Sequence, residues 1–341
     1  MSNPAKMLEA AREAVVLASN VCRQVQAQLD TVRSITKDDK SPVTVADFAS
    51  QAIVARTLTE HLGDVVLVAE EASAFLREEG HEAHRDAVVA AVREVWPEAT
   101  EAEVLDSIDV GSGDATRSAF WTLDPIDGTK GFLRNQQYAV ALGYVENGTP
   151  TLGVMGCPNL PRDMSQPLDE PDGHGVVYFC LKGEGVYEAP SDDLDASPIR
   201  ITRLDHVSGE EVCITGSVEK AHSDTSAEGQ ILKWLEDEKG ETIGESVRLD
   251  SQCKYAVVAR GQADAYLRMP TRAGYVERIW DHAAGALVAS EAGAAVSDIF
   301  GNSLDFSHGA GLEKNKGVIC APPALHGKII AAIEALGIKP A

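Results

Sequence analysis

The chain has 341 residues, of which 44% are hydrophobic and 24% are charged, and its formal net charge is −23. This length and composition support a large buried core built from more than one layered unit. An acidic surface of this kind repels a phosphodiester backbone, which argues against DNA or RNA as a partner. The sequence offers no membrane span and no secretory signal, and its six cysteines are scattered without a CxxC pair. We therefore expect a cytoplasmic protein with reduced thiols.

Hydrophobic periodicity predicts two helices near the N-terminus, over about residues 5–30 and 46–62. The apolar run VVLVAEE, residues 65–71, predicts a short buried strand that ends in two carboxylates. A charged helical region follows over 75–109. After the loop GSGDATRS, a strand is predicted over 121–124.

Two β-hairpins are expected next. The first joins 138–145 to 151–157 through Asn147-Gly148, and the second covers 176–187. The polar segment PSDDLDASP indicates a boundary between an N-terminal α+β lobe (1–190) and a C-terminal α/β lobe (191–341). In the second lobe, the strands EVCITGS, ADAYLRM and GAAVSDI alternate with helices predicted over 227–237, 281–292 and 323–336.

The stretch DPIDGT, residues 124–129, carries two carboxylates within four residues. Pro125 lacks an N–H, so we expect the strand ladder to stop there. The following turn would place Asp124, the Ile126 carbonyl and Asp127 on one side, an oxygen set that suits Mg²⁺. Gly128 has no side chain, so a ligand could approach its backbone closely. Thr129 would begin a helix whose N–H groups favour phosphate. Taken alone, the motif is explained equally well by a plain turn.

Three further acidic sites strengthen the metal interpretation. Asp47 is expected at the start of the second helix, Glu70 and Glu71 at the end of a buried strand, and Asp281 just before an Ala-rich helix. Capping would explain Asp47 and Asp281 separately, and a surface pair would explain the glutamates. Together with DPIDGT, these acidic positions at strand ends and helix starts predict a Mg²⁺ site with several ions.

The segments SPVTVAD, VAEEAS, WTLDPIDGTKGFLR and WDHAAG, in this order, resemble the lithium-sensitive, Mg²⁺-dependent phosphatases of the inositol monophosphatase superfamily. The resemblance runs from about residue 5 to 330 and implies an α+β or α/β fold, a layered α/β/α/β/α sandwich with two lobes. Lys130-Gly131, SVEKAHS and SQCKYAVVARGQADAYLR are similar to the 3'(2'),5'-bisphosphate nucleotidase branch. The sequence departs from many relatives at VAEE, where they have GEE, and at Cys253. Neither departure removes a charge or a donor.

This resemblance implies roles for the matched residues. Two or three Mg²⁺ ions would be held by Glu70, Asp124, the Ile126 carbonyl, Asp127 and Asp281. The attacking water would be oriented and deprotonated by Asp47 and Thr129.

The substrate would be held by Gly128, Thr129, His222, Ser251, Lys254 and Arg268. For Lys254 and Arg268 the alternative is solvation at a strand edge, and for His222 it is an exposed loop histidine. ITGS, residues 214–217, is a weaker candidate for a phosphate-binding turn.

The implied reaction is hydrolysis of the 3'-phosphate of 3'-phosphoadenosine 5'-phosphate to AMP and phosphate, with 3'-phosphoadenylyl sulfate as a second candidate substrate. The partner is thus a small nucleotide, and the protein is expected as a monomer or homodimer. Inhibition by Li⁺ is also implied. Two alternatives stay open: an inositol (poly)phosphate phosphatase, and a non-catalytic nucleotide sensor. The intact Asp47 and Thr129 pair argues against the sensor, because binding alone does not require an activated water.

Overall fold

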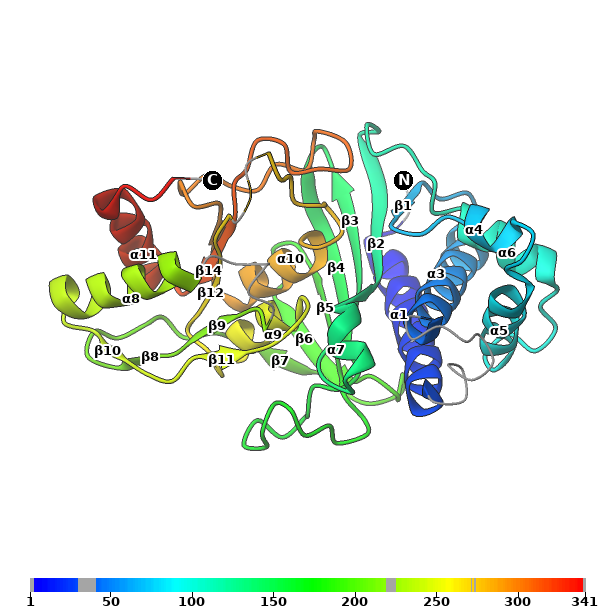
Figure 1. Cartoon of the computed structure of the whole chain (residues 1–341), viewed down its shortest axis with the longest axis horizontal. Helices are drawn as coiled ribbons and strands as arrows, with labels where there is room; N and C mark the ends of the chain where they lie inside the picture. Colours follow the sequence, from blue (N-terminus) through cyan, green and yellow to red (C-terminus); the bar gives the residue numbers. More distant parts are fainter. Residues whose placement is uncertain (1–2, 30–40, 219–224, 271, 273, 340–341) are drawn as a thin grey trace.

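Two β-sheets alternate with three helical layers in the order α/β/α/β/α (Figure 1). The structure is a computed structural model that describes residues 3–29, 41–218, 225–270, 272 and 274–339. In Figure 1 the N-terminal helices lie on one side of the first sheet, and the second sheet lies toward the opposite end of the molecule. The layered sandwich predicted from the sequence is confirmed.

The first sheet contains seven strands in chain order, with β1 parallel to β2 and each later pair antiparallel. Both predicted hairpins are confirmed. The β3–β4 turn uses Asn147 and Gly148, whose φ angles of 49° and 74° suit a two-residue turn. The last strand follows residue 190, so the sheet includes residues from both sides of the expected lobe boundary. The strands are β1 (Leu67–Ala69), β2 (Ala119–Asp127), β3 (Ala139–Glu146), β4 (Thr149–Cys157), β5 (Val176–Leu181), β6 (Val186–Pro190) and β7 (Ile199–Ile201).

The second sheet has five strands in the order β11-β9-β12-β14-β13. β11, β9 and β12 are parallel, whereas β14 is antiparallel to both of its neighbours. The predicted strand EVCITGS divides into β8 and β9, and β8 pairs with β10 in a separate sheet. The strands are β8 (Glu211–Val212), β9 (Ile214–Gly216), β10 (Thr242–Ile243), β11 (Val247–Arg248), β12 (Ala265–Arg268), β13 (Ala295–Ser297) and β14 (Val318–Ala321).

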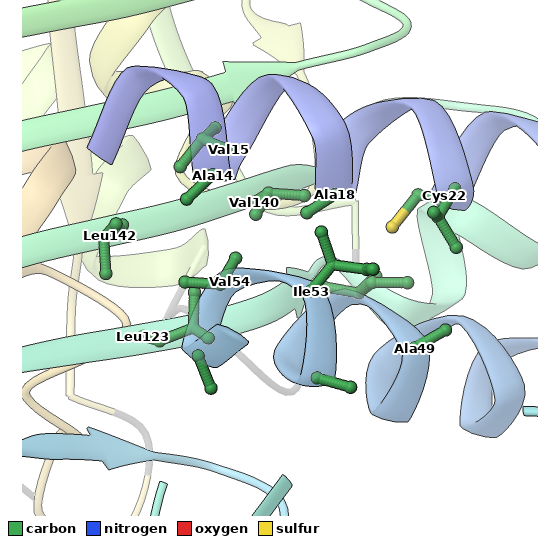
Figure 2. Close-up of a cluster of buried hydrophobic side chains, with 14 of the residues drawn as sticks. Ala14, Val15, Ala18, Cys22, Ala49, Ile53, Val54, Leu123, Val140 and Leu142 are labelled. Atoms are coloured by element: carbon green, nitrogen blue, oxygen red, sulfur yellow. The ribbon is translucent and has the colours of Figure 1, made fainter. Parts of the chain in front are cut away.

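Helices α1 (Pro4–Ala27) and α3 (Ser41–Leu62) cover one face of the first sheet. Figure 2 shows small and branched side chains of the two helices meeting near Leu123, Val140 and Leu142 of the sheet. All of these side chains are buried, so the contact is close-packed. The outer helices α5 (Glu82–Arg93) and α6 (Glu101–Asp109) pack against α3, and α4 (Ala74–Arg77) packs against α5.

Helices α9 (Cys253–Ala259) and α10 (Ala283–Ala292) fill the space between the two sheets. A Cβ at Gly143 of β3 would lie only 3.0 Å from the Cβ of Ala283, so small residues let α10 approach the first sheet. This packing explains the small residues of WDHAAG. The outer face of the second sheet is covered by α8 (Thr225–Lys239) and α11 (Pro323–Leu336). Among the described helices, none combines the length and apolar composition that crossing a membrane requires.

Candidate active site

A β-bulge in β2 brings the two aspartates of DPIDGT to the same face of the sheet. Asp124 pairs with Ala141 and Asp127 pairs with Ala139, so three steps along β2 match two steps along β3. In a regular strand, residues three apart point to opposite faces, and the extra residue reverses this. The expectation that the ladder stops at Pro125 is therefore wrong, because β2 continues to Asp127 with a shift in register.

Gly128 ends this segment in the left-handed conformation, with a φ of 92°, and it is the N-cap of the short helix α7 (Thr129–Leu133). A Cβ here would lie 2.8 Å from the Cβ of Ser251. Glycine therefore permits both the turn and the close approach of the Ser251 loop. Thr129 begins a helix, as predicted.

Asp47 lies in the second turn of α3 and is only 7% exposed. The described part of this helix runs from Ser41 to Leu62. The prediction that Asp47 starts this helix is therefore wrong, and N-capping does not explain this side chain. Three residues later, the Ser50 hydroxyl donates a hydrogen bond of 2.9 Å to the Pro125 carbonyl. This bond holds the Asp47 face of α3 against the bulge.

Glu70 and Glu71 directly follow β1, as predicted. The fully buried Gln51 of α3 fixes the backbone at this point. Its Nε2 donates to the Glu71 carbonyl over 2.7 Å, and its Oε1 accepts from the Glu71 N–H over 3.1 Å. The strand end that presents Glu70 is therefore held from the helix that carries Asp47.

Asp281 immediately precedes His282, the N-cap residue of α10. Its side chain forms an ion pair instead. Asp281 Oδ2 lies 3.8 Å from Arg268 Nη2. The capping alternative for Asp281 is therefore wrong.

One cavity of about 500 Å³ collects these side chains, a volume in the range of small-molecule sites. Asp47 is buried near its wall, since its charge acts on Asp124. His222 lies outside the described residues. The predicted site residues that line the cavity are Glu70, Asp124, Ile126, Asp127, Gly128, Thr129, Ser251, Lys254, Arg268 and Asp281.

The carboxylates at one end of the cavity repel one another. Burial, then the charges of Asp127 and Glu70, raise the pKa of Asp124 well above its usual range. Burial, then Glu71 and Asp127, raise the pKa of Glu70 to about 7. Burial also raises the pKa of Asp47 and of Asp281, although Arg268 opposes the shift at Asp281. Such a cluster is costly unless protons or cations compensate its charge.

The cavity also contains a cationic region around Arg268. Its guanidinium binds Glu277 through two atoms, with Nε 2.8 Å from Oε1 and Nη2 2.6 Å from Oε2. The buried His282 lies 3.4 Å from Glu277 Oε2 and 2.9 Å from the Tyr255 hydroxyl. Burial by itself would raise the pKa of Glu277, but Arg268 and His282 outweigh it and lower the pKa to about 2. These bonds hold the Arg268 guanidinium in one orientation.

Lys254 supplies a second buried cation. It is 4% exposed, its ammonium lies 3.4 Å from the Leu249 carbonyl, and burial lowers its pKa to about 8. An anionic ligand in the cavity would favour its charged form. Ser251 begins this turn with a φ of 68°, a strained conformation for a residue with a side chain. Strand-edge solvation is wrong for both Lys254 and Arg268, because both lie in the cavity wall.

The acidic end of the cavity fits divalent cations. Its side-chain donors are carboxylate oxygens, which hard cations prefer. Within the described chain, Asp124 Oδ1 is buried and has no hydrogen-bond partner. A cation is the partner that would offset both this burial and the repulsion among the carboxylates.

The sequence model of the inositol monophosphatase family matches residues 3–337. The chain belongs to the inositol monophosphatase family. The 3'(2'),5'-bisphosphate nucleotidase of Schizosaccharomyces pombe is 39% identical over 97% of this chain and 95% of its own length. The 3',5'-bisphosphate nucleotidase 2 of Arabidopsis thaliana is 37% identical over 96% of both chains.

Solved structures of the family share the fold. Inositol monophosphatase from Anabaena (Nostoc) sp. PCC 7120 superposes with a TM-score of 0.61 at 19% identity, covering 98% of this chain and 97% of that one. SuhB of Mycobacterium tuberculosis gives a TM-score of 0.60 at 18% identity and covers 98% of both chains. These comparisons confirm the family resemblance inferred from the four motifs.

The sequence analysis missed several residues that line or support the cavity. Glu277 had a detectable signal, since it stands four residues before Asp281 in VERIWDH. Gln51 had none, because its partners are backbone atoms distant in sequence. Ser217 of the weak ITGS candidate does line the cavity. The other unpredicted lining residues are Lys130, Asp250, Met269, Pro270, Arg272 and Tyr275.

The raised carboxyl pKa values predict a pH-dependent effect of Mg²⁺ on stability. Between pH about 4.5 and 7 the folded protein keeps protons on groups such as Glu70 that the unfolded chain has released. The free energy of unfolding contributed by these groups therefore falls as pH rises through this window when no metal is present. Mg²⁺ competes with the same protons, so its stabilising effect should grow from pH 5 to 7.5.

Thermal unfolding with a chelator and with Mg²⁺, at each pH, measures this difference. Burial lowers the pKa of His282, which makes stability rise with pH, but this contribution occurs in both series and cancels. A Mg²⁺ effect that stays constant over this pH range would contradict the prediction.

Proposed function

We propose that this protein is a Mg²⁺-dependent 3'(2'),5'-bisphosphate nucleotidase. It hydrolyses the 3'-phosphate of 3'-phosphoadenosine 5'-phosphate to AMP and phosphate. The observation that carries the proposal is a single cavity lined both by a carboxylate cluster that includes Asp124 and by the cations Lys254 and Arg268. A substrate with two phosphates would suit both groups. Relatives named for this activity cover almost the whole chain.

The carboxylate end would receive the phosphate that is cleaved. Two or three Mg²⁺ ions would be held by Glu70, Asp124, the Ile126 carbonyl, Asp127 and Asp281. When bound, Mg²⁺ neutralises the phosphate charge and lowers the pKa of a coordinated water. The backbone N–H groups after Gly128 would donate to the phosphate oxygens. Asp47 would accept the proton of the attacking water through the Thr129 hydroxyl.

The cationic end would hold the second phosphate and the nucleoside. Arg268 would donate to the 5'-phosphate, and Lys254 would contribute a point charge from the α9 turn. Ser251 would contact the sugar and phosphate, as would His222, which lies outside the described residues. Pro270 and the half-exposed Tyr275 give this part of the cavity an apolar surface for a base. An inositol monophosphate would leave this region unused.

We propose a division of the chain into two lobes that both contribute to the site. Residues 1–190 would form one lobe, which supplies Asp47, Glu70 and the DPIDGT segment. Residues 191–341 would form the other, which supplies Ser251, Lys254, Arg268 and Asp281. We place the protein in the cytoplasm, with the nucleotide as its partner and 3'-phosphoadenylyl sulfate as a second substrate.

A panel of phosphate monoesters tests the proposed function. The kcat/KM for 3'-phosphoadenosine 5'-phosphate should exceed that for inositol monophosphate by about 100-fold, because charge-assisted hydrogen bonds contribute about 1.5–3 kcal/mol each and 1.4 kcal/mol is tenfold. Turnover should require Mg²⁺ and be inhibited by Li⁺. Faster release of phosphate from inositol phosphates would favour the inositol phosphatase instead. Nucleotide binding without turnover in saturating Mg²⁺ would favour the sensor.

A further inference from the structure

Gln252 connects two segments that carry carboxylates of the active site. It is 2% exposed and lies between Ser251 and the first residue of α9. Its backbone N–H donates to Asp127 Oδ2 over 2.6 Å. Its side chain points to α10, where Nε2 donates to the Trp280 carbonyl over 2.8 Å and Oε1 accepts from the Gly285 N–H over 3.0 Å.

The bonds to Trp280 and Gly285 lie on either side of Asp281. Gly285 is the third residue of α10, so its N–H is one of the donors that a helix leaves without an internal partner. The N-cap residue His282 makes no side-chain capping bond. Gln252 therefore performs the capping of α10 from a different helix and fixes the helix start that presents Asp281.

The glycine of WDHAAG makes this contact possible. A Cβ at Gly285 would lie 3.0 Å from Gln252 Oε1 and 2.3 Å from Cδ2 of Tyr255. A larger residue would push the amide and the tyrosine ring away from α10. The absence of a side chain at Gly285 therefore lets Gln252 approach α10 this closely.

We propose that Gln252 is a positioning residue, which sets the distance between the metal-binding carboxylates Asp127 and Asp281 and couples both to the nucleotide-binding turn at Ser251. This inference rests on the proposed function for the roles of these three residues. Groups that hydrogen-bond to metal ligands typically change metal affinity by about 10–100-fold when they are altered, and the backbone N–H of Gln252 is such a group for Asp127. Gln252 differs from Gln51, which bonds to the backbone at Glu71 and Ile108, because Gln252 contacts both the Asp127 side chain and the helix start next to Asp281.

Mn²⁺ binding to the nucleotide-free protein, followed by electron paramagnetic resonance, tests the proposal. Gln252→Met keeps the backbone N–H and the side-chain length but loses both amide bonds to α10. We expect Mn²⁺ affinity to fall about tenfold and the Mg²⁺ concentration for half-maximal turnover to rise by a similar factor. If this variant does not fold, Gln252→Asn, which is one methylene too short to bridge, replaces it in the same measurements.

Gln26→Met is the matched control. Gln26 is also buried, and its amide donates to the Phe132 carbonyl over 2.8 Å and accepts from Asn159 over 3.1 Å, outside the cavity. It should lose thermal stability while keeping the Mn²⁺ affinity of the wild type. Equal Mn²⁺ affinity in wild type and in the Gln252 variants would overturn the positioning role. If the wild type binds Mn²⁺ but does not hydrolyse the nucleotide, the proposed function fails while the comparison of affinities still decides the role of Gln252.

Discussion

Replacing Asp124 with asparagine should lower kcat for the bisphosphate by about 10³-fold or more while the chain remains folded. The expected loss follows from the several kcal/mol that a metal site contributes to stabilising the transition state, at 1.36 kcal/mol for each tenfold change in rate. Asp124 is buried, shares a face with Asp127 and has an oxygen without a hydrogen-bond partner among the described residues. Steady-state kinetics in saturating Mg²⁺ measure the loss. Near-normal turnover would remove Asp124 from the site.

The same substitution should raise the stability of the metal-free protein. Burial and neighbouring carboxylates raise the pKa of Asp124, which means that its ionised form destabilises the fold at neutral pH. The substituted asparagine would carry no charge, so the free energy of unfolding in a chelator should increase, whereas stabilisation by Mg²⁺ should largely disappear. Asp64→Asn, a change of the same kind in an exposed bend after α3, is the control and should alter neither quantity.

The elements and the convergence of the acidic side chains could be predicted from the sequence. Hydrophobic periodicity located the long helices α1 and α3, and turn residues located the hairpins. The acidic motifs follow β1, lie in β2 and precede α10, and packing brings these element ends together at one cavity. The resemblance to the family supplied the order of the motifs, which the match over residues 3–337 confirms.

Local geometry was less predictable. Pro125 predicts a break in the strand, but the structure absorbs it in a bulge, and only this bulge gives Asp124 and Asp127 the same face. The second helix was predicted from residue 46, but α3 already includes Ser41 and Pro42, since a proline is tolerated near a helix start as well as in a break. Short strands such as β14 pair antiparallel inside the second sheet and carry little periodic signal over four residues.

Polar contacts between distant segments could not be predicted at all. Gln252 stands inside the motif SQCKY, but its partners at Trp280 and Gly285 are fixed by the packing of α9 against α10. Glu277 is an ordinary acidic residue in the sequence and becomes the partner of Arg268 only because β12 and the loop before α10 meet. Both residues shape the site through tertiary structure rather than through local pattern.

Arg268→Met should raise the KM for 3'-phosphoadenosine 5'-phosphate by about 10–100-fold, because the guanidinium would contribute a charge-assisted hydrogen bond to the 5'-phosphate. The KM for a nucleoside 3'-monophosphate, which lacks that phosphate, should change little. The same variant should also lose about 3 kcal/mol of stability, because it leaves the buried carboxylate of Glu277 without its main partner. The Arg268 side chain is thus expected to contribute both to nucleotide binding and to the stability of the fold.

The double variant Arg268→Met, Glu277→Gln separates these two effects. It removes both charges of the pair, and the introduced glutamine would still reach His282, so the free energy of unfolding should recover to within about 1 kcal/mol of the wild type. The KM for the bisphosphate should remain high, since Glu277 positions the guanidinium but offers no positive charge of its own. If restoring stability also restored the KM, Arg268 would act only on the fold. A KM that stays high in a stable protein, for the bisphosphate and not for the 3'-monophosphate, would assign the 5'-phosphate to Arg268.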